Sequence, residues 1–195
     1  LASALGWAAA NSVDKAVYTY VEANGTLSDG GALFNSTAVS TTGGHANLAG
    51  ANAAVTVSSL ALGEAAMAAQ ADPSRTTVLG LRPRFLVVPY GKKQIAWEVL
   101  NSPTDVASSN SAKRNYAASL GLELIAAPNL TGSIAWYLFA DRNTPCIEVA
   151  FLDGQQTPYI EEDVVFMTDE MRMKVRLDFG VAATEWRTGG KNAGV

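Results

Sequence analysis

The sequence predicts an α+β protein, with helices early in the chain and strands concentrated in its second half. The first 24 residues repeat apolar side chains at spacings of three and four, which is typical of one face of a helix. From residue 122 onward, short runs of β-branched and aromatic residues are separated by turn residues, which is typical of strands. A chain of 195 residues without internal repeats or a proline-rich linker suits one domain, or two small lobes that share a core.

Residues 1–24 are predicted to form a single long helix. A pair that tolerates left-handed backbone, Asn24-Gly25, ends it. At 1.5 Å per residue the helix would span about 35 Å, so we expect a strut that is unbroken at Gly6 and exposed along one side. Its apolar stripe consists of Leu5, Ala9, Val13, Ala16, Val17, Tyr20 and Val21.

A long polar segment and a second helix follow. Residues 25–54 are rich in Gly, Ser, Thr and Asn and predict a loop with at most a short strand. Residues 57–71 predict a helix whose N-cap is Ser58 or Ser59. A loop of this length inside a compact domain indicates a function, or ordering by contact with another element.

The middle of the chain predicts a buried strand, a helix and an exposed loop. The strand is expected at 84–89, which contains the apolar run FLVV, and the helix at 91–101. Residues 101–118 are polar and lack periodicity, so we expect an exposed, mobile loop.

The second half predicts a succession of short strands. Asp153-Gly154 is a strong turn signal, so 157–160 is expected to return beside the strand that precedes it. Residues 173–179 alternate apolar and charged side chains and predict a half-buried strand, while the glycine-rich tail after Trp186 is expected to be loose. The strands before the turn are expected at 122–126, 136–140 and 146–152.

Composition limits the classes of function. Apolar residues make up 48% of the chain and charged residues only 16%. Such a low charged fraction is expected of a protein whose surface contacts other chains, and equally of an alanine-rich protein without such contacts. The net charge is −4 and no basic stripe is present, which argues against nucleic-acid binding as the main activity. No segment reaches the length of a membrane span.

Residues with catalytic potential are few and poorly arranged. One histidine, His45, and one cysteine, Cys146, cannot form a usual zinc site. His45 is expected to make a local structural hydrogen bond, and Cys146 to be a small buried hydrophobe without a group nearby to activate it. No G-x-S-x-G elbow, P-loop or dinucleotide fingerprint is present. We therefore expect no catalytic residue, no metal and no cofactor.

A run of acids, Glu161, Glu162 and Asp163, invites an acid–base interpretation. Consecutive residues in a strand point to different sides, so these carboxylates would not converge on one substrate. The run instead predicts an acidic edge that faces solvent or a partner.

The second half of the chain also resembles a known family. The segments WYLFADRNTPCIEVAFLDGQQTPYIEE and MKVRLDFGVAATEWR, with HANLAG and RPRFLVVP before them, resemble phage major capsid proteins of the Mu-like head-subunit type. These proteins also occur fused behind a ClpP-like prohead protease. The family is similar to the Hong Kong 97 phage capsid fold, which has a spine helix, a peripheral lobe of long β-strands and an axial lobe of helices around a central sheet.

The resemblance implies a division of the chain. Residues 1–54 and 145–195 would form the peripheral lobe, with 1–24 as its spine helix, and 55–144 the axial lobe. Residues 101–118 would lie near the centre of a capsomer. The family's N-terminal arm and extended loop, which precede the spine helix, and the protease region are absent from these 195 residues. The resemblance therefore predicts a monomer or a weak ring for this chain alone.

The resemblance also implies a structural function. Copies of the chain would form pentamers and hexamers of an icosahedral virion capsid, assembled in the bacterial cytoplasm, with a scaffold or protease as possible helpers. Packaged DNA would be contacted only non-specifically. The subunit contacts would include Glu161, Glu162 and Asp163, paired with Lys174 or Arg176 of a neighbour and weakened by salt. The alternatives are a prohead protease or small hydrolase that uses His45 with a serine, and an encapsulin-like compartment shell.

Overall fold

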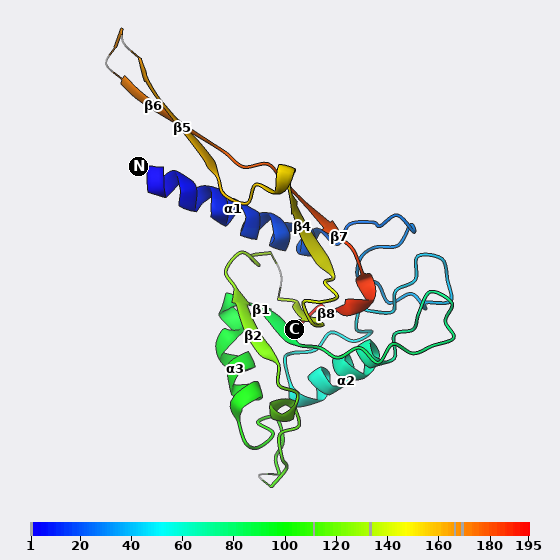
Figure 1. Ribbon diagram of the computed structural model, residues 1–195. Helices are drawn as coiled ribbons and strands as arrows, with labels where there is room; N and C mark the ends of the chain where they lie inside the picture. Colours follow the sequence, from blue (N-terminus) through cyan, green and yellow to red (C-terminus); the bar gives the residue numbers. More distant parts are fainter. Residues whose placement is uncertain (1, 111, 133, 166, 169) are drawn as a thin grey trace.

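A central sheet, a long helix and a projecting ribbon make up the molecule (Figure 1). A computed structural model describes residues 2–110, 112–132, 134–165, 167–168 and 170–195. Leu1 of the predicted first helix and Ser111 of the predicted polar loop lie outside the described residues. Helices and strands are both present, as the predicted α+β class requires.

The central sheet has the strand order β2-β1-β3-β8. Strand β2 runs parallel to β1, whereas β3 is antiparallel to both β1 and β8. The strands are β1 (Phe85–Pro89), β2 (Glu123–Ala127), β3 (Trp136–Phe139) and β8 (Gly189–Asn192).

Strand β8 shows that the predicted loose tail is wrong. A Cβ added at Gly189 would lie 2.6 Å from Sγ of Cys146, so this position has no room for a side chain. The glycines that suggested flexibility are instead compatible with close packing, which explains the error.

Each face of the sheet carries its own apolar core, because successive residues of a strand point to opposite sides. Leu86 and Leu138 belong to the core that includes α2 and α3 (Lys93–Asn101). Val87 and Tyr137, their neighbours in sequence, belong to the core that includes Val21 of the first helix. The sheet is therefore covered on both sides.

Helix α2 (Val57–Ala68) begins at Val57, as predicted, but its N-cap lies two residues before Ser58. Thr56 is the N-cap: its side chain accepts a hydrogen bond from the Ser59 amide, and the Ser59 side chain accepts one from the Thr56 amide. The predicted cap at Ser58 or Ser59 is therefore wrong, although Ser59 takes part in the capping box. The helix also ends before residue 71, the predicted end.

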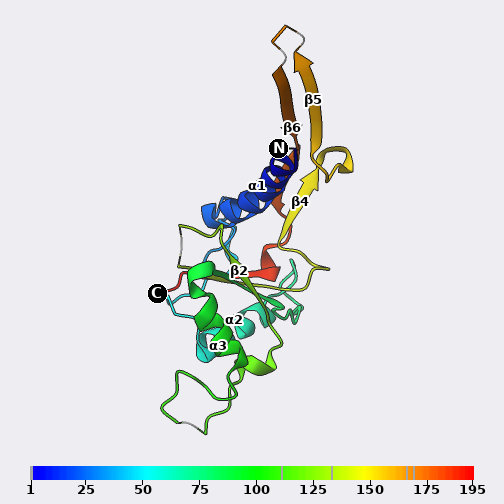
Figure 2. The same ribbon diagram turned by 90° about the vertical axis from the view of Figure 1, so that its left-hand side faces the viewer.

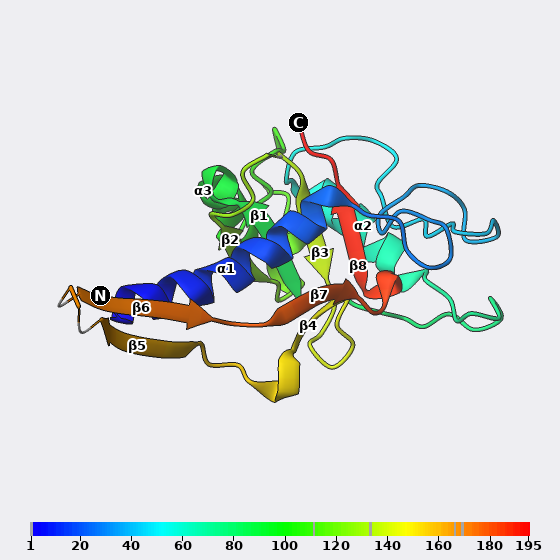
Figure 3. The same ribbon diagram turned by 90° about the horizontal axis from the view of Figure 1, so that it is seen from above.

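Helix α1 (Ala2–Ala23) is a single element that crosses the sheet and continues beyond it along the ribbon (Figure 3). Of its residues whose exposure the structure describes, only Val21 is fully buried. The prediction of an unbroken, largely exposed strut is thus confirmed for these residues. At its end Asn24 has a φ of 49°, and its side chain exchanges hydrogen bonds with the backbone of Phe34.

The ribbon is a long interrupted hairpin. Strand β4 (Ile147–Phe151) pairs with β7 (Phe179–Ala183), and β5 (Tyr159–Val165) pairs with β6 (Glu170–Arg176) farther out. Figure 2 shows it standing away from the sheet and the helices α2 and α3.

The predicted pairing of this segment is wrong, because 157–160 does not pair with β4; Tyr159 and Ile160 instead begin β5, which pairs with β6. Asp153 and Gly154 do adopt left-handed backbone, with φ of 52° and 71°. They lie in a short turn between β4 and β5, on one side of the ribbon, and not at the tip of the hairpin.

Between the end of α3 at Asn101 and the turn η2 (Ala117–Ser119), the described residues 102–110 and 112–116 form no helix or strand, which agrees with the predicted loop. Thr104 and Arg114 form a bridge across it. Asp105 is buried and pairs with Nζ of Lys113 at 2.8 Å. The predicted mobility of this loop stays a prediction.

Candidate assembly surface

The outer part of the ribbon, which consists of β5 and β6, has two faces of different chemistry. Side chains alternate between its faces, and residues opposite each other in the register share a face. One face carries the charged pairs Glu161–Lys174 and Asp163–Arg172. The other carries the mostly apolar pairs Ile160–Val175, Glu162–Met173 and Val164–Met171.

The charges on the first face are largely neutralised within the ribbon. Glu161 forms an ion pair with Lys174, and this hydrogen bond is the main reason why the pKa of Glu161 lies below its ordinary value. Arg176 pairs with Asp178 at 3.4 Å and lies 5.9 Å from the centre of the Tyr159 ring. Such exposed pairs contribute little to stability, but they leave little unbalanced charge.

The apolar face, defined by the three pairs above, is covered along only part of its length. A Cβ at Gly6 of α1 would lie 4.0 Å from Cδ1 of Ile160, and Val175 on the opposite strand is half-buried. Beyond α1 the same face continues with Val164, which is 59% exposed, and Met171, which is 63% exposed. A contiguous apolar surface at the end of a projecting element is typical of a contact with another chain.

The structure brings together some of the predicted contact residues. Glu161 and Lys174 are paired, but within one chain, so a pairing of Glu161 with a neighbour's Lys174 would have to displace this bond. Glu162 lies on the apolar face, opposite Met173. Within the described part of the chain, neither Glu162 nor Asp163 has an ion-pair partner. Pairing of these residues across subunits stays a prediction.

Val164 and Met171 were missed by the sequence interpretation. The signal was present, because Met171, Met173 and Val175 are apolar at every second position. The predicted strand began at residue 173 and therefore left out its outer end.

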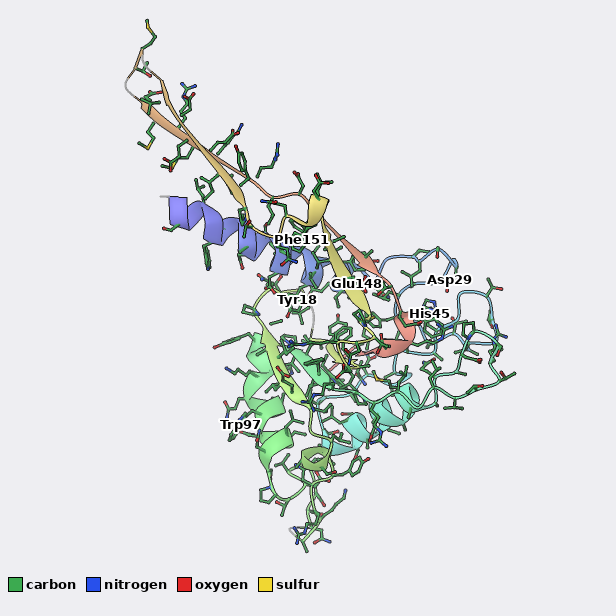
Figure 4. The ribbon with its side chains drawn as sticks, in the orientation of Figure 1. Tyr18, Asp29, His45, Trp97, Glu148 and Phe151 are labelled. Carbon is green, nitrogen blue, oxygen red and sulfur yellow. The ribbon has the colours of Figure 1, made fainter. Side chains whose placement is uncertain are left out.

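The two candidate catalytic residues, His45 and Cys146, are both buried. His45 is fully buried and lies beside Asp29 (Figure 4). Its ring nitrogens contact Asp29 and the Leu33 carbonyl rather than a nucleophile. Burial raises the pKa of the Cys146 thiol to about 12, so its thiolate is scarce at neutral pH. Among the described residues, no group of His, Cys, Asp and Glu is arranged to hold a metal ion, and no helix has the length and apolarity of a membrane span.

A family model described as "Phage capsid protein" matches residues 1–192. No curated protein matches the chain significantly, and no solved structure does.

Proposed function

Because this chain belongs to the phage capsid protein family, we propose that it is the major subunit of a phage head, which tiles with copies of itself into an icosahedral shell around DNA. The family places it in the virion capsid as a structural protein. The observation that carries the proposal is the uncovered apolar face of the ribbon at Val164 and Met171.

The proposal assigns the parts of the structure to the lobes of the Hong Kong 97 phage fold. Helix α1 is the spine helix, and the ribbon from β4 to β7 is the peripheral lobe. The sheet with α2 and α3 is the axial lobe. Since β8 pairs with β3, residues 189–192 belong with the axial lobe in this assignment rather than with the peripheral one.

The proposed contact uses burial rather than charge. Apolar surface removed from water stabilises a contact by about 25 cal/mol per Å². The exposed end of the ribbon is small, so each contact is weak, and closure of the shell depends on many contacts made at once. The contact is heterologous, since the ribbon end of one subunit meets a different surface of the next, which permits rings. Glu162 and Asp163 at its rim add a salt-sensitive component.

Val164→Asp tests this proposal in the intact chain. Placing a carboxylate on the apolar face is expected to reduce assembly at least ten-fold, measured by light scattering and electron microscopy at fixed protein concentration. Val78→Asp is the matched control, because Val78 is the same residue type with a similar exposure of 64% and lies outside the ribbon. Circular dichroism checks that both variants fold. Equal assembly of Val164→Asp and Val78→Asp would contradict the proposed contact.

The contents of the particles separate a phage head from a compartment shell. A phage head assembled in the bacterial cytoplasm, with a transient scaffold or protease, ends with DNA inside. Particles purified from infected or induced cells are therefore expected to contain nuclease-protected DNA. Particles filled with a cargo protein and free of DNA would support the compartment alternative instead.

A further inference from the structure

The only histidine of the sequence lies at a buried junction of three segments. The ring of His45 is fully buried, with Nε2 2.8 Å from Oδ2 of Asp29 and Nδ1 3.1 Å from the carbonyl oxygen of Leu33. Figure 4 shows Asp29 and His45 side by side, next to the end of β7. These residues belong to the segment of residues 25–48, which we name the 25–48 loop.

Both partners of the ring are hydrogen-bond acceptors. A carboxylate and a backbone carbonyl accept but do not donate, whereas a neutral imidazole has one donor and one lone pair. A neutral His45 would therefore direct a lone pair at an oxygen, and only the imidazolium donates to both. The hydrogen bond from His45 is also the main reason why the pKa of Asp29 lies below its ordinary value, with the Gly31 amide second. The counter-ion is thus kept ionised.

The ring and the backbone of His45 also connect the loop to distant parts of the chain. It stacks on the indole of Trp186, with ring centres 4.3 Å apart and an angle of 18° between planes. Gln70, which follows α2, donates from Nε2 to the backbone oxygen of His45 at 3.1 Å. The Trp186 ring in turn lies 4.2 Å from the guanidinium of Arg187.

The charges at this junction, within the described residues, come from separate segments. Asp29 belongs to the 25–48 loop, whereas Arg187 and Glu185 belong to the C-terminal turn and pair with each other at 2.8 Å. With Arg187 neutralised by Glu185, Asp29 is the carboxylate that faces the histidine ring.

We infer that His45 is a proton-dependent staple, which as an imidazolium joins Asp29 to the Leu33 carbonyl within the 25–48 loop and stacks on Trp186, and which loosens the loop when the ring loses its second proton. Histidine is the side chain that ordinarily changes charge between about pH 5 and 8. A positively charged imidazolium also stacks more strongly on an indole ring than a neutral imidazole does. A surface segment of each subunit would then respond to pH while the sheet stays intact.

The direction of the response follows from the two titrating partners. The staple is complete when the ring is protonated and Asp29 is ionised. Raising the pH removes the ring proton and loosens the loop. Lowering the pH loosens it only once Asp29 is protonated, which the lowered pKa of Asp29 moves below its ordinary range. The Leu33 carbonyl keeps a second donor, Nδ2 of Asn47 at 2.9 Å, so the loop loosens without unfolding.

Nuclear magnetic resonance of the full chain tests the staple directly. Because the sequence has one histidine, its ring nitrogen signals need no assignment by mutagenesis. At about pH 5.5, near the lower end of the range in which histidine ordinarily titrates, both ring nitrogens of His45 are expected to carry protons. At about pH 8.5 one proton should be lost. In parallel, the amides of Gly31, His45 and Ala46 should exchange roughly ten-fold faster at the higher pH, after correction for intrinsic rates.

Variants separate the staple from a general effect of pH. His45→Phe retains an aromatic ring for Trp186 but carries no proton, and should abolish the pH dependence of loop exchange. Asp29→Asn should shift the loss of the ring proton to lower pH, since a facing negative charge is removed. Asp14→Asn is the control, because Asp14 is an α1 carboxylate hydrogen-bonded to Asn129, away from the loop.

Either of two results would overturn the inference. One is a His45 ring whose number of protons does not change in the folded chain between about pH 5.5 and 8.5, the range that brackets ordinary histidine titration. The ring would then carry one proton throughout, or two throughout. The other is a His45→Phe loop with the same pH-dependent exchange as the unmodified chain. If His45→Phe does not fold, Asp29→Asn decides, because an unchanged ring titration in that variant also contradicts the staple.

Discussion

At the scale of single residues, Gly189 shows how the close packing of one strand depends on the absence of a side chain. A Cβ there would meet Sγ of Cys146 at 2.6 Å and ring atoms of Phe139 and Phe34 at 3.3 Å. All three of these partners belong to the core that α1 covers. The position therefore requires glycine for space, and not for an unusual backbone angle.

Gly189→Ala is expected to lower the free energy of unfolding by about 1–3 kcal/mol, the usual cost of overpacking a core. Urea unfolding followed by circular dichroism measures the change. Gly50→Ala is the control, because Gly50 has no heavy atom within 4 Å of an added Cβ. A Gly189→Ala variant as stable as Gly50→Ala would mean that the sheet is less tightly packed at β8 than described.

At the scale of elements, local signals in the sequence were sufficient for some features and not for others. Helix α1 was predicted because its apolar period and its Asn24-Gly25 end are both local. The left-handed pair Asp153-Gly154 was also recognised, but its place in the ribbon depends on β7, which pairs with β4 from far along the chain. Pairing between distant strands leaves no signal in either strand alone.

The 101–118 loop is expected to depend on the ion pair between Asp105 and Lys113. The pKa of Asp105 is lowered, chiefly by the hydrogen bond from Lys113. A group with a lowered folded-state pKa stabilises the fold above its unfolded value, about 3.9 for Asp, and this contribution is lost as the pH falls through the folded value. Asp105→Asn should therefore speed hydrogen exchange of residues 104–115 at pH 7, and this effect should shrink as the pH falls below about 3.9.

Measurement of exchange by mass spectrometry, region by region, checks this prediction. Asp141→Asn supplies the comparison, since Asp141 also accepts hydrogen bonds within a local turn, from Asn143, but lies outside this loop. Faster exchange throughout the chain in Asp105→Asn would indicate global destabilisation rather than local release of the loop.

At the scale of the whole molecule, the candidate assembly surface was only partly predictable. The acidic run Glu161 to Asp163 could be read from the sequence, and its placement on a projecting element agrees with an edge. That Glu161 is already neutralised by Lys174 required the register of β5 and β6. The exposure of Val164 required the position where α1 stops covering the ribbon, which is a property of the three-dimensional arrangement.

Deletion of residues 187–195 is expected to destabilise the whole fold, and not merely to shorten a tail. It removes β8 from the sheet together with the contacts that Asn47 and Ala49 make to Lys191. We expect loss of the cooperative thermal transition, measured by circular dichroism. Deletion of Gly194 and Val195 alone is the comparison and should retain a cooperative transition. Equal melting of the long deletion and the full chain would show that β8 is dispensable.

The position of β8 also has a consequence for synthesis on the ribosome. Strands β1 to β3 are translated first, and the whole ribbon follows before β8 emerges to pair with β3. During that interval the nascent sheet presents β3 as an open edge, and unpaired edges of this kind attract strands of other chains. A subunit with the proposed function would be made in many copies, so the interval between β3 and β8 would be the stage of translation at which misassociation is most favoured.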